Sequence, residues 1–301
     1  EKLGDRIKNW FTFNEPQVFV GYGLLDDPRP GNQRFWNEVT HAAHNILLSH
    51  GRAVQVIRST GSAETRVGMA PVGITYVPNS DSPEDIEAAR LAMFEVHEPT
   101  QWQNSLWMDP MFFGRYPEHY EKVFTHYRPN IGPDDMAIIS QPVDFLAVNT
   151  YSAIRVKANK EKGWENVTFG PETPLTAYNW FVEPSCLYWG PKFYYERYKV
   201  PIYMTENGLS SMDWVSLDGK VHDPNRIDYL HRHLRELKRS IADGTDVQGY
   251  FQWSMLDNFE WSEGYKERFG LIYVDMATGQ RTPKDSYDWY KRVIATNGAE
   301  I

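Results

Sequence analysis

The 301-residue chain contains a single cysteine, Cys186, so it cannot form an internal disulfide. One cysteine fits a reducing compartment, and we expect a cytoplasmic protein. Cys186 has no evident histidine partner, and we interpret it as a packed thiol and not as a nucleophile. There is no apolar run of about 18 residues and no signal-peptide pattern, so no membrane segment is expected. The first residue is not methionine, which leaves the true N-terminus open.

The chain also has no excess of basic residues. The chain has 40 acidic and 31 basic residues and a net charge of −9. This sign, and the lack of a basic stripe with interleaved aromatics, exclude nucleic acid as the expected partner. His41 with His44, and His231 with His233, lie close together on expected helices, but neither pair has a third ligand at metal spacing. We interpret them as helix-surface or capping residues, and we expect no metal or organic cofactor.

Aromatic residues are abundant. They make up 15% of the chain, with 11 Trp and 18 Tyr, in an otherwise ordinary composition of 41% hydrophobic and 24% charged residues. One explanation of this aromatic content is a core rich in packed aromatic rings. The alternative is a binding site, since aromatic faces stack on the apolar faces of sugar rings. The grouping of aromatics near Trp180, Trp253 and Trp261 favours the binding site.

Strand and helix patterns alternate along the chain. The strands are expected at Asn9–Glu15, Arg66–Val72, Phe145–Asn149, Ile202–Glu206 and Val247–Trp253. The helices are expected at Arg34–Arg58, from Pro83 to about His97 with Asp81 as its cap, near Glu118–His126, from about Asn225 to Ala242, and from near Pro283. This alternation predicts an α/β protein with a parallel sheet. With no repeats or linker-like stretches, residues 1–301 are interpreted as a single domain.

Two glutamates each end a short run of β-branched and aromatic residues. Glu15 follows Trp10–Asn14, and Glu206 follows Pro201–Thr205. A carboxylate at the C-terminal end of a buried parallel strand points into the mouth of a β/α barrel, where such folds place catalysis. Two glutamates far apart in sequence meet there only if the sheet curves back on itself. A facing pair of carboxylates is what glycoside hydrolysis requires.

The motifs around both glutamates are specific. Thr-Phe-Asn-Glu-Pro at residues 12–16 and Thr-Glu-Asn-Gly at residues 205–208 resemble the two signature segments of glycoside hydrolase family 1, the β-glucosidase family. Further matches are the segments 109–117, 144–151, 252–261, 264–271, 281–284 and 289–290. The resemblance implies a TIM (β/α)8-type barrel. The five predicted strand–helix units are similar to the family's fourth to eighth, so the barrel is expected to be incomplete, with about five of eight units.

The resemblance implies a role for each residue around the two carboxylates. It makes Glu15 the general acid/base, Glu206 the nucleophile, Asn14 a partner of the sugar 2-hydroxyl and Tyr151 a hydrogen-bond donor to the nucleophile, with Asn149 among the substrate-binding residues. Three of these residues have a plainer alternative. Glu15 is also a helix-start acid beside the helix dipole, Glu206 a surface acid in a turn, and Tyr151 a core aromatic with a satisfied hydroxyl.

The segment Gln252–Trp261 resembles the family's sugar-recognition loop. There the resemblance implies that Glu260 and Trp261 hold outer sugar hydroxyls and that Trp253 floors the same subsite. Trp180 resembles the platform for the leaving group, with simple packing as the alternative. Family members that act on 6-phosphorylated glycosides have Ser in place of this Glu. A carboxylate repels a phosphate, so Glu260 predicts unphosphorylated β-glucosides, with galactosides or fucosides tolerated.

The resulting prediction is a retaining β-glucosidase that acts by double displacement, with the Glu15 and Glu206 carboxyl groups about 5–5.5 Å apart. Two alternatives stay open: a non-catalytic sugar-binding or scaffold remnant, and a fragment inactive without a complementing chain. The family's first three units, with a Gln and a His that bind the sugar, have no counterpart here. The chain starts in what resembles the loop before the fourth strand, from Lys2 to Arg6. Open strand edges predict a homo-oligomer, or a separate N-terminal fragment, that completes the barrel.

Overall fold

The computed structural model describes residues 3–23 and 33–301, so Lys2 lies outside the described residues. Five parallel strands, in chain order, form a curved wall: β1 (Asn9–Asn14), β2 (Arg66–Ala70), β4 (Leu146–Asn149), β7 (Ile202–Asn207) and β8 (Val247–Gln252). Backbone hydrogen bonds join β2 to β4, from Asp144 N to the Val67 oxygen and from Gly73 N to the Asn149 oxygen, both 2.8 Å. All five predicted strands are therefore confirmed.

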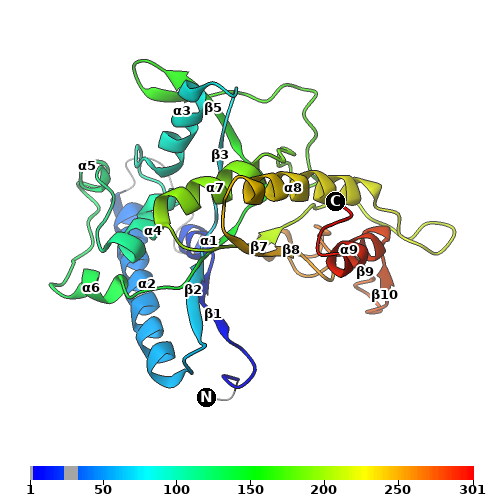
Figure 1. The fold of residues 1–301 in the computed structure, drawn as a ribbon, viewed down its shortest axis with the longest axis horizontal. Coiled ribbons are helices and arrows are strands. Elements are labelled where there is room, and N and C mark those ends of the chain that lie inside the picture. Colours follow the sequence, from blue (N-terminus) through cyan, green and yellow to red (C-terminus); the bar gives the residue numbers. More distant parts are fainter. Residues whose placement is uncertain (1–2, 24–32) are drawn as a thin grey trace.

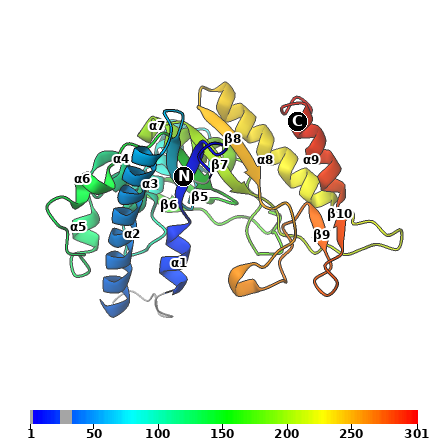
Figure 2. The same cartoon turned by 90° about the horizontal axis from the view of Figure 1, so that it is seen from below.

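Helices cover the outer face of this wall (Figure 1). They are α2 (Gln33–Thr60) over β1 and β2, α7 (Cys186–Tyr198) over β7, and α8 (Pro224–Ala242) with α9 (Asp285–Ala295) beside it. Seen from below, α2 and α9 lie at opposite sides of the molecule (Figure 2). A short strand followed by a helix that packs back against it is the repeating unit of parallel α/β proteins.

The remaining elements lie between these units. They are α1 (Pro16–Gly23), β3 (Tyr76–Pro78), α3 (Pro83–Phe94), α4 (Asn104–Phe113), α5 (Tyr120–Val123), α6 (Asp135–Ile139), β5 (Ile154–Asn159), β6 (Gly163–Asn166), the 3-10 turn η1 (Trp261–Glu263), β9 (Ile272–Val274) and β10 (Arg281–Pro283). Strands β3, β5 and β6 form a small sheet beside α3, and β9 with β10 forms a hairpin.

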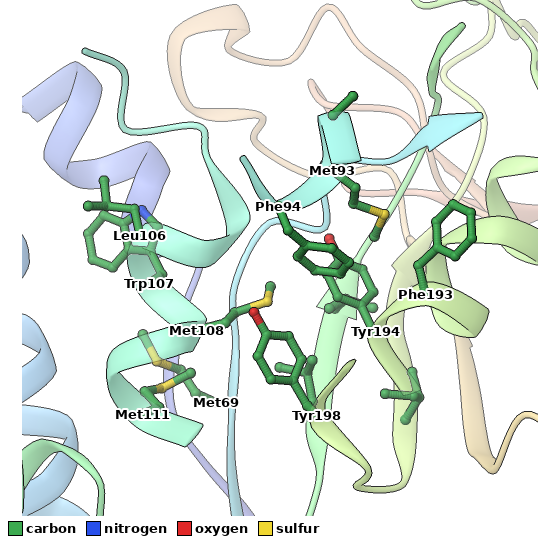
Figure 3. Packing of buried hydrophobic residues seen from close by; sticks show 14 of the residues in the cluster. Met69, Met93, Phe94, Leu106, Trp107, Met108, Met111, Phe193, Tyr194 and Tyr198 are labelled. Carbon is green, nitrogen blue, oxygen red and sulfur yellow. The ribbon is translucent and has the colours of Figure 1, made fainter. Parts of the chain in front are cut away.

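The largest apolar core lies on the outer side of the wall, among α2, α3, α4 and α7 (Figure 3). Its aromatic members meet edge to face, as Phe94 does with Tyr194 and Tyr198 at centroid distances of 5.9 and 6.0 Å. Cys186 is fully buried in this core, and burial raises the pKa of its thiol well above the usual value. Such a thiol stays protonated and unreactive, so the prediction of a packed thiol is confirmed. No helix within residues 3–23 and 33–301 has both the length and the apolarity to cross a membrane.

Three predicted helix boundaries are wrong. The N-cap of α3 is Ser82 and not Asp81, because the Ser82 hydroxyl accepts a hydrogen bond from Asp85 N at 3.2 Å. This helix stops at Phe94 and does not reach His97, since the backbone at Glu95 is already extended. The last helix begins at Asp285, because Pro283 pairs with β9 as the end of β10.

The segment near Glu118–His126 is shorter than predicted, with only Tyr120–Val123 in a helix. The prediction also missed α1, α4 and α7, together with the small sheet of β3, β5 and β6. Both α4 and α7 contain an internal proline, Pro110 and Pro191, which sequence rules treat as a helix breaker. Dense burial on almost every side of these helices offsets that cost.

Candidate functional site

Both glutamates lie where a strand of the wall ends. Glu15 follows β1 with a positive φ of 46°, and its N–H donates to the Ala70 oxygen at 2.8 Å before α1 begins at Pro16. Glu206 is the fifth residue of β7, and a Cβ at Gly208 would lie only 1.9 Å from the Trp253 carbonyl oxygen. The glycine is therefore required for the close approach of the two chain segments that carry Glu206 and Trp253.

A chain of side-chain amides connects the two carboxylates. The Asn149 Nδ2 donates to Glu15 Oε1 at 2.8 Å and to Asn14 Oδ1 at 3.0 Å. The Asn14 Nδ2 then donates to Glu206 Oε1 at 3.3 Å, and the Tyr151 hydroxyl donates to Glu206 Oε2 at 2.6 Å. The ends of β1, β4 and β7 thus bring together all five residues that the sequence placed around the reaction centre.

Both carboxyl groups hold their protons more tightly than exposed carboxylic acids do. Burial raises the pKa of Glu15, and the Asn149 hydrogen bond lowers it by less. Burial, with the nearby Glu15 charge, raises the pKa of Glu206 to about 7, against the lowering effect of the Tyr151 and Asn14 hydrogen bonds. Two interacting carboxyls titrate as a pair, and this pair retains a proton at pH values where an exposed glutamate is ionised.

Aromatic rings stand beside the carboxylates. The Trp180 ring lies 4.3 Å from Tyr178, 5.0 Å from Tyr151 and 6.2 Å from Phe269, measured between centroids. Trp180 is half-buried, so it both packs in this group and offers surface. The position of Trp180 is therefore consistent with both interpretations from the sequence, a platform for the leaving group and simple packing.

Glu260 enters the same site from the loop that follows β8. Burial raises the pKa of Glu260, a hydrogen bond with the Trp253 side chain lowers it, and the negative charge of Glu15 raises it. Glu260 and Trp253 therefore share the electrostatic environment of the Glu15 and Glu206 carboxyl groups. Trp261 differs, because its side chain is 79% exposed and it starts the 3-10 turn with a φ of 31°.

A buried ion network holds the loop that bears Glu260. The Lys284 Nζ lies 2.8 Å from Asp257 Oδ1 and 2.5 Å from Asp213 Oδ2, and all three side chains are at most 2% exposed. Arg226 reaches Asp213 at 2.7 Å, and Arg268 reaches Asp257 at 2.7 Å. These ion pairs connect the loop after β7, the loop after β8 and the start of α9 into one unit.

The network extends to Asp223, the residue before α8. Asp223 pairs with Arg226, and it accepts hydrogen bonds from Ser286 N at 2.8 Å and from the Ser286 hydroxyl at 2.5 Å. Sequence reasoning missed this network, because its members are scattered acidic and basic residues without a motif. It also overlooked Thr205, which lies inside the second signature segment and touches Asn149.

Within residues 3–23 and 33–301, no group of three or more His, Cys, Asp or Glu residues is arranged so that it could hold a metal ion. The expectation of helix-surface positions is wrong for two of the paired histidines. His44 is buried between Tyr116, 2.9 Å away, and Asp135, 3.1 Å away. His233 is fully buried against the Tyr229 carbonyl, and burial lowers its pKa to about 4, so it is neutral.

Paired carboxylates at the ends of parallel strands, with aromatic rings beside them, are the arrangement that glycoside hydrolysis requires. The comparison with family models agrees: residues 1–299 match the model of glycosyl hydrolase family 1, and the chain belongs to that family. The recognition of the family from its two signature segments is therefore confirmed.

Similar proteins carry β-glucosidase names. The chain is 39% identical over 301 residues to "Beta-glucosidase A" of Thermotoga maritima and 35% identical over 320 residues to the "Bifunctional beta-D-glucosidase/beta-D-fucosidase" of Bifidobacterium breve. These alignments cover 100% and 99% of the chain, and 66% of each relative. The solved structure "Family 1 b-glucosidase from Thermotoga maritima" superposes with a TM-score of 0.83 at 39% identity, over 100% of this chain and 66% of that one. The fold is thus that of a partial barrel of this family.

Lys284→Met tests the ion network. The substitution removes the positive charge of Lys284 and leaves the buried Asp213 and Asp257 carboxylates with fewer cations to balance them. We expect the free energy of unfolding to fall by about 3–5 kcal/mol. The matched control is Lys157→Met, which breaks an exposed ion pair with Glu165 and is expected to cost less than about 1 kcal/mol. Urea denaturation followed by tryptophan fluorescence measures both, and equal losses would contradict the role of the network.

Glu206→Gln tests the raised pKa of Glu206. The folded state holds a proton on Glu206 between the ordinary value near 4.5 and about 7, whereas the unfolded state has lost it, so this group makes stability fall as pH rises through that window. The amide cannot ionise. We expect the variant to match the parent near pH 4 and to exceed it at pH 8 by about 1–2 kcal/mol, allowing for solvent screening. Denaturation curves at both pH values decide this, with exposed Glu165→Gln as the control.

Proposed function

We propose that the chain carries the catalytic part of a retaining β-glucosidase that acts on unphosphorylated β-glucosides. The main support is the asymmetry of hydrogen bonds at the two carboxyl groups. Among the residues that the structure describes, Glu206 accepts hydrogen bonds from Tyr151 and Asn14, whereas Glu15 accepts one from Asn149. Donors stabilise a carboxylate more than a carboxylic acid, so these hydrogen bonds favour the negative charge on Glu206, and they act against burial and the Glu15 charge, which raise the pKa of Glu206 to about 7. We assign the nucleophile to Glu206, which has two donors, and the acid to Glu15, which has one.

The proposed reaction has two displacements. A Glu206 oxygen attacks the anomeric carbon while Glu15 gives its proton to the glycosidic oxygen, so the aglycone leaves as a neutral alcohol. Glu15, now ionised, removes a proton from water, and the resulting oxygen attacks the same carbon and releases Glu206. Each displacement inverts the centre, and the two together retain its configuration. Carboxyl groups about 5–5.5 Å apart suit this path.

Substrate recognition is proposed from the loop after β8. Glu260 and Trp261 would hold outer sugar hydroxyls, Trp253 would floor the sugar subsite, and Trp180 would face the aglycone. A 6-phosphate would meet the Glu260 carboxylate, so the plain glucoside is preferred. The relative from Bifidobacterium breve, described as a glucosidase and fucosidase, supports tolerance of a sugar without the 6-hydroxyl.

The wall ends in two strands that lack a neighbour on one side among the described residues. Phe11 on the β1 edge is 41% exposed and Phe251 on the β8 edge is 54% exposed. Unpaired edges and exposed apolar rings drive association. We propose a single domain, residues 1–301, that corresponds to the fourth to eighth of eight units and is completed by a second copy of the chain or by a separate N-terminal fragment. The cytoplasmic location stays a prediction from the cysteine content.

The activity is tested with an aryl β-glucoside and its 6-phosphate. We expect hydrolysis of the plain glucoside with β-glucose as the first product by proton NMR, and little hydrolysis of the phosphorylated one. Glu206→Gln should lower kcat by roughly 10³-fold or more, and azide added to Glu206→Gly should restore turnover with inverted product. Exposed Glu165→Gln is the control. First-formed α-glucose would contradict retention, and binding of glucose without any turnover would favour the sugar-binding remnant.

The association is tested by light scattering with intact-mass analysis of the purified protein. We expect a species heavier than the 35.0 kDa chain, held by a largely apolar interface of roughly 2,000 Å² or more. A single mass of chain within that species supports self-association, and a second polypeptide supports the fragment. An active, folded monomer would contradict completion from outside. Phe11→Ser with Phe251→Ser should shift the assembly towards monomer.

A further inference from the structure

Thr205 lies on β7 immediately before Glu206, and its side chain reaches the neighbouring strand. Its hydroxyl donates to Asn149 Oδ1 at 2.6 Å. Asn149 ends β4, which pairs with β7, and only 1% of its surface is exposed. The contact therefore links two adjacent strand ends directly beneath the pair of carboxylates.

An asparagine amide has two unlike ends, an oxygen that accepts and an NH2 that donates. Because the Thr205 hydroxyl donates to the oxygen of Asn149, the NH2 of Asn149 must face the other way. Its two hydrogens go to Glu15 Oε1, at 2.8 Å, and to Asn14 Oδ1, at 3.0 Å. This second bond occupies the oxygen of Asn14, so the NH2 of Asn14 is turned towards Glu206 Oε1, at 3.3 Å.

We propose that Thr205 is a positioning residue that sets the direction of this amide chain, so that a donor and not an acceptor meets each of the two carboxylates. The hydrogen bonds run in one direction only, from Thr205 through Asn149 to Glu15, and through Asn14 to Glu206. The importance of this amide orientation for catalysis rests on the proposed function. The orientation itself acts on the two carboxyl groups, whether or not the chain is an enzyme.

Loss of the Thr205 hydroxyl removes the hydrogen bond that the Asn149 oxygen accepts in its present orientation. If Asn149 turns over, its oxygen faces Glu15. An amide oxygen repels a carboxylate but accepts a hydrogen bond from a carboxylic acid. Asn14 can then turn as well and present its oxygen to Glu206. Both changes favour the protonated form, so the pKa values of both groups rise. Glu260 and Tyr151 also act on the pair, from the loop after β8 and from the end of β4. Thr205→Val leaves both in place.

The experiment is a carboxyl NMR titration of the full chain labelled with [δ-¹³C]glutamate, with the two signals assigned through Glu15→Gln and Glu206→Gln. In Thr205→Val, which keeps the shape and removes the hydroxyl, we expect the Glu15 midpoint to move upward by about one pH unit. Thr205→Ser restores the hydroxyl and should return the midpoint towards the parent value. Thr205→Ala, without added bulk, serves as a second variant if the valine variant does not fold.

Thr150→Val is the matched control, because Thr150 is a buried threonine beside Asn149 whose hydroxyl donates at 3.1 Å to the Gly73 carbonyl and to no member of the amide chain. Unchanged midpoints in the valine and alanine variants would overturn the proposal, and so would an equal shift in Thr150→Val. The titration needs no turnover, so an inactive chain refutes the proposed function and leaves this test intact. If the chain is active, the alkaline limb of kcat/KM should move upward in the same variant.

Discussion

Compensation of buried charge is the constraint on which the site depends. Lys284 is withdrawn from water together with two aspartates from different loops, and an aspartate beside α8 joins through Arg226. Each charge would be costly alone, and each is acceptable only while its partners stay in place. The network therefore gives the loops after β7 and β8 a single arrangement. Glu206 lies near the end of β7, just before the first of these loops, and Glu260 lies on the second, so the ion network helps to fix their relative position.

The reaction centre is built on the opposite principle. Among the described residues, the nearest donors to the Glu15 and Glu206 carboxylates are neutral amides and a hydroxyl. Glu260 adds a third negative group. Neutral donors stabilise charge only in part, which leaves the pKa values raised. A cation at the same place would favour the ionised form of both groups. The fold thus compensates charge fully in the ion network and only in part at Glu15 and Glu206, where the pKa values are raised.

The sequence was sufficient to predict the five strands, the family and the residues around the two glutamates, because period, turn signals and signature segments are local. It was insufficient for helices with an internal proline, such as α7, where burial decides against propensity. It did not predict the ion network or the contact of Thr205 with Asn149, since these join residues on different strands and loops. It also placed His44 on a surface, although α6 covers it and supplies Asp135. Each of these misses depends on tertiary neighbours that no local pattern encodes.

The five strands differ in burial in a regular way. Every residue of β4, in the middle, is buried, whereas β1 and β8 at the two edges contain only exposed and half-buried positions. Backbone amides exchange with solvent through local openings whose free energy follows such burial. Hydrogen exchange should therefore be slowest in the centre and faster towards both edges, with Asn149 anchored in the most protected strand and Glu15 at the end of one of the least protected. Glu15 stands on the part of the wall that we expect to open first, and a neighbour that pairs with this edge would slow its exchange.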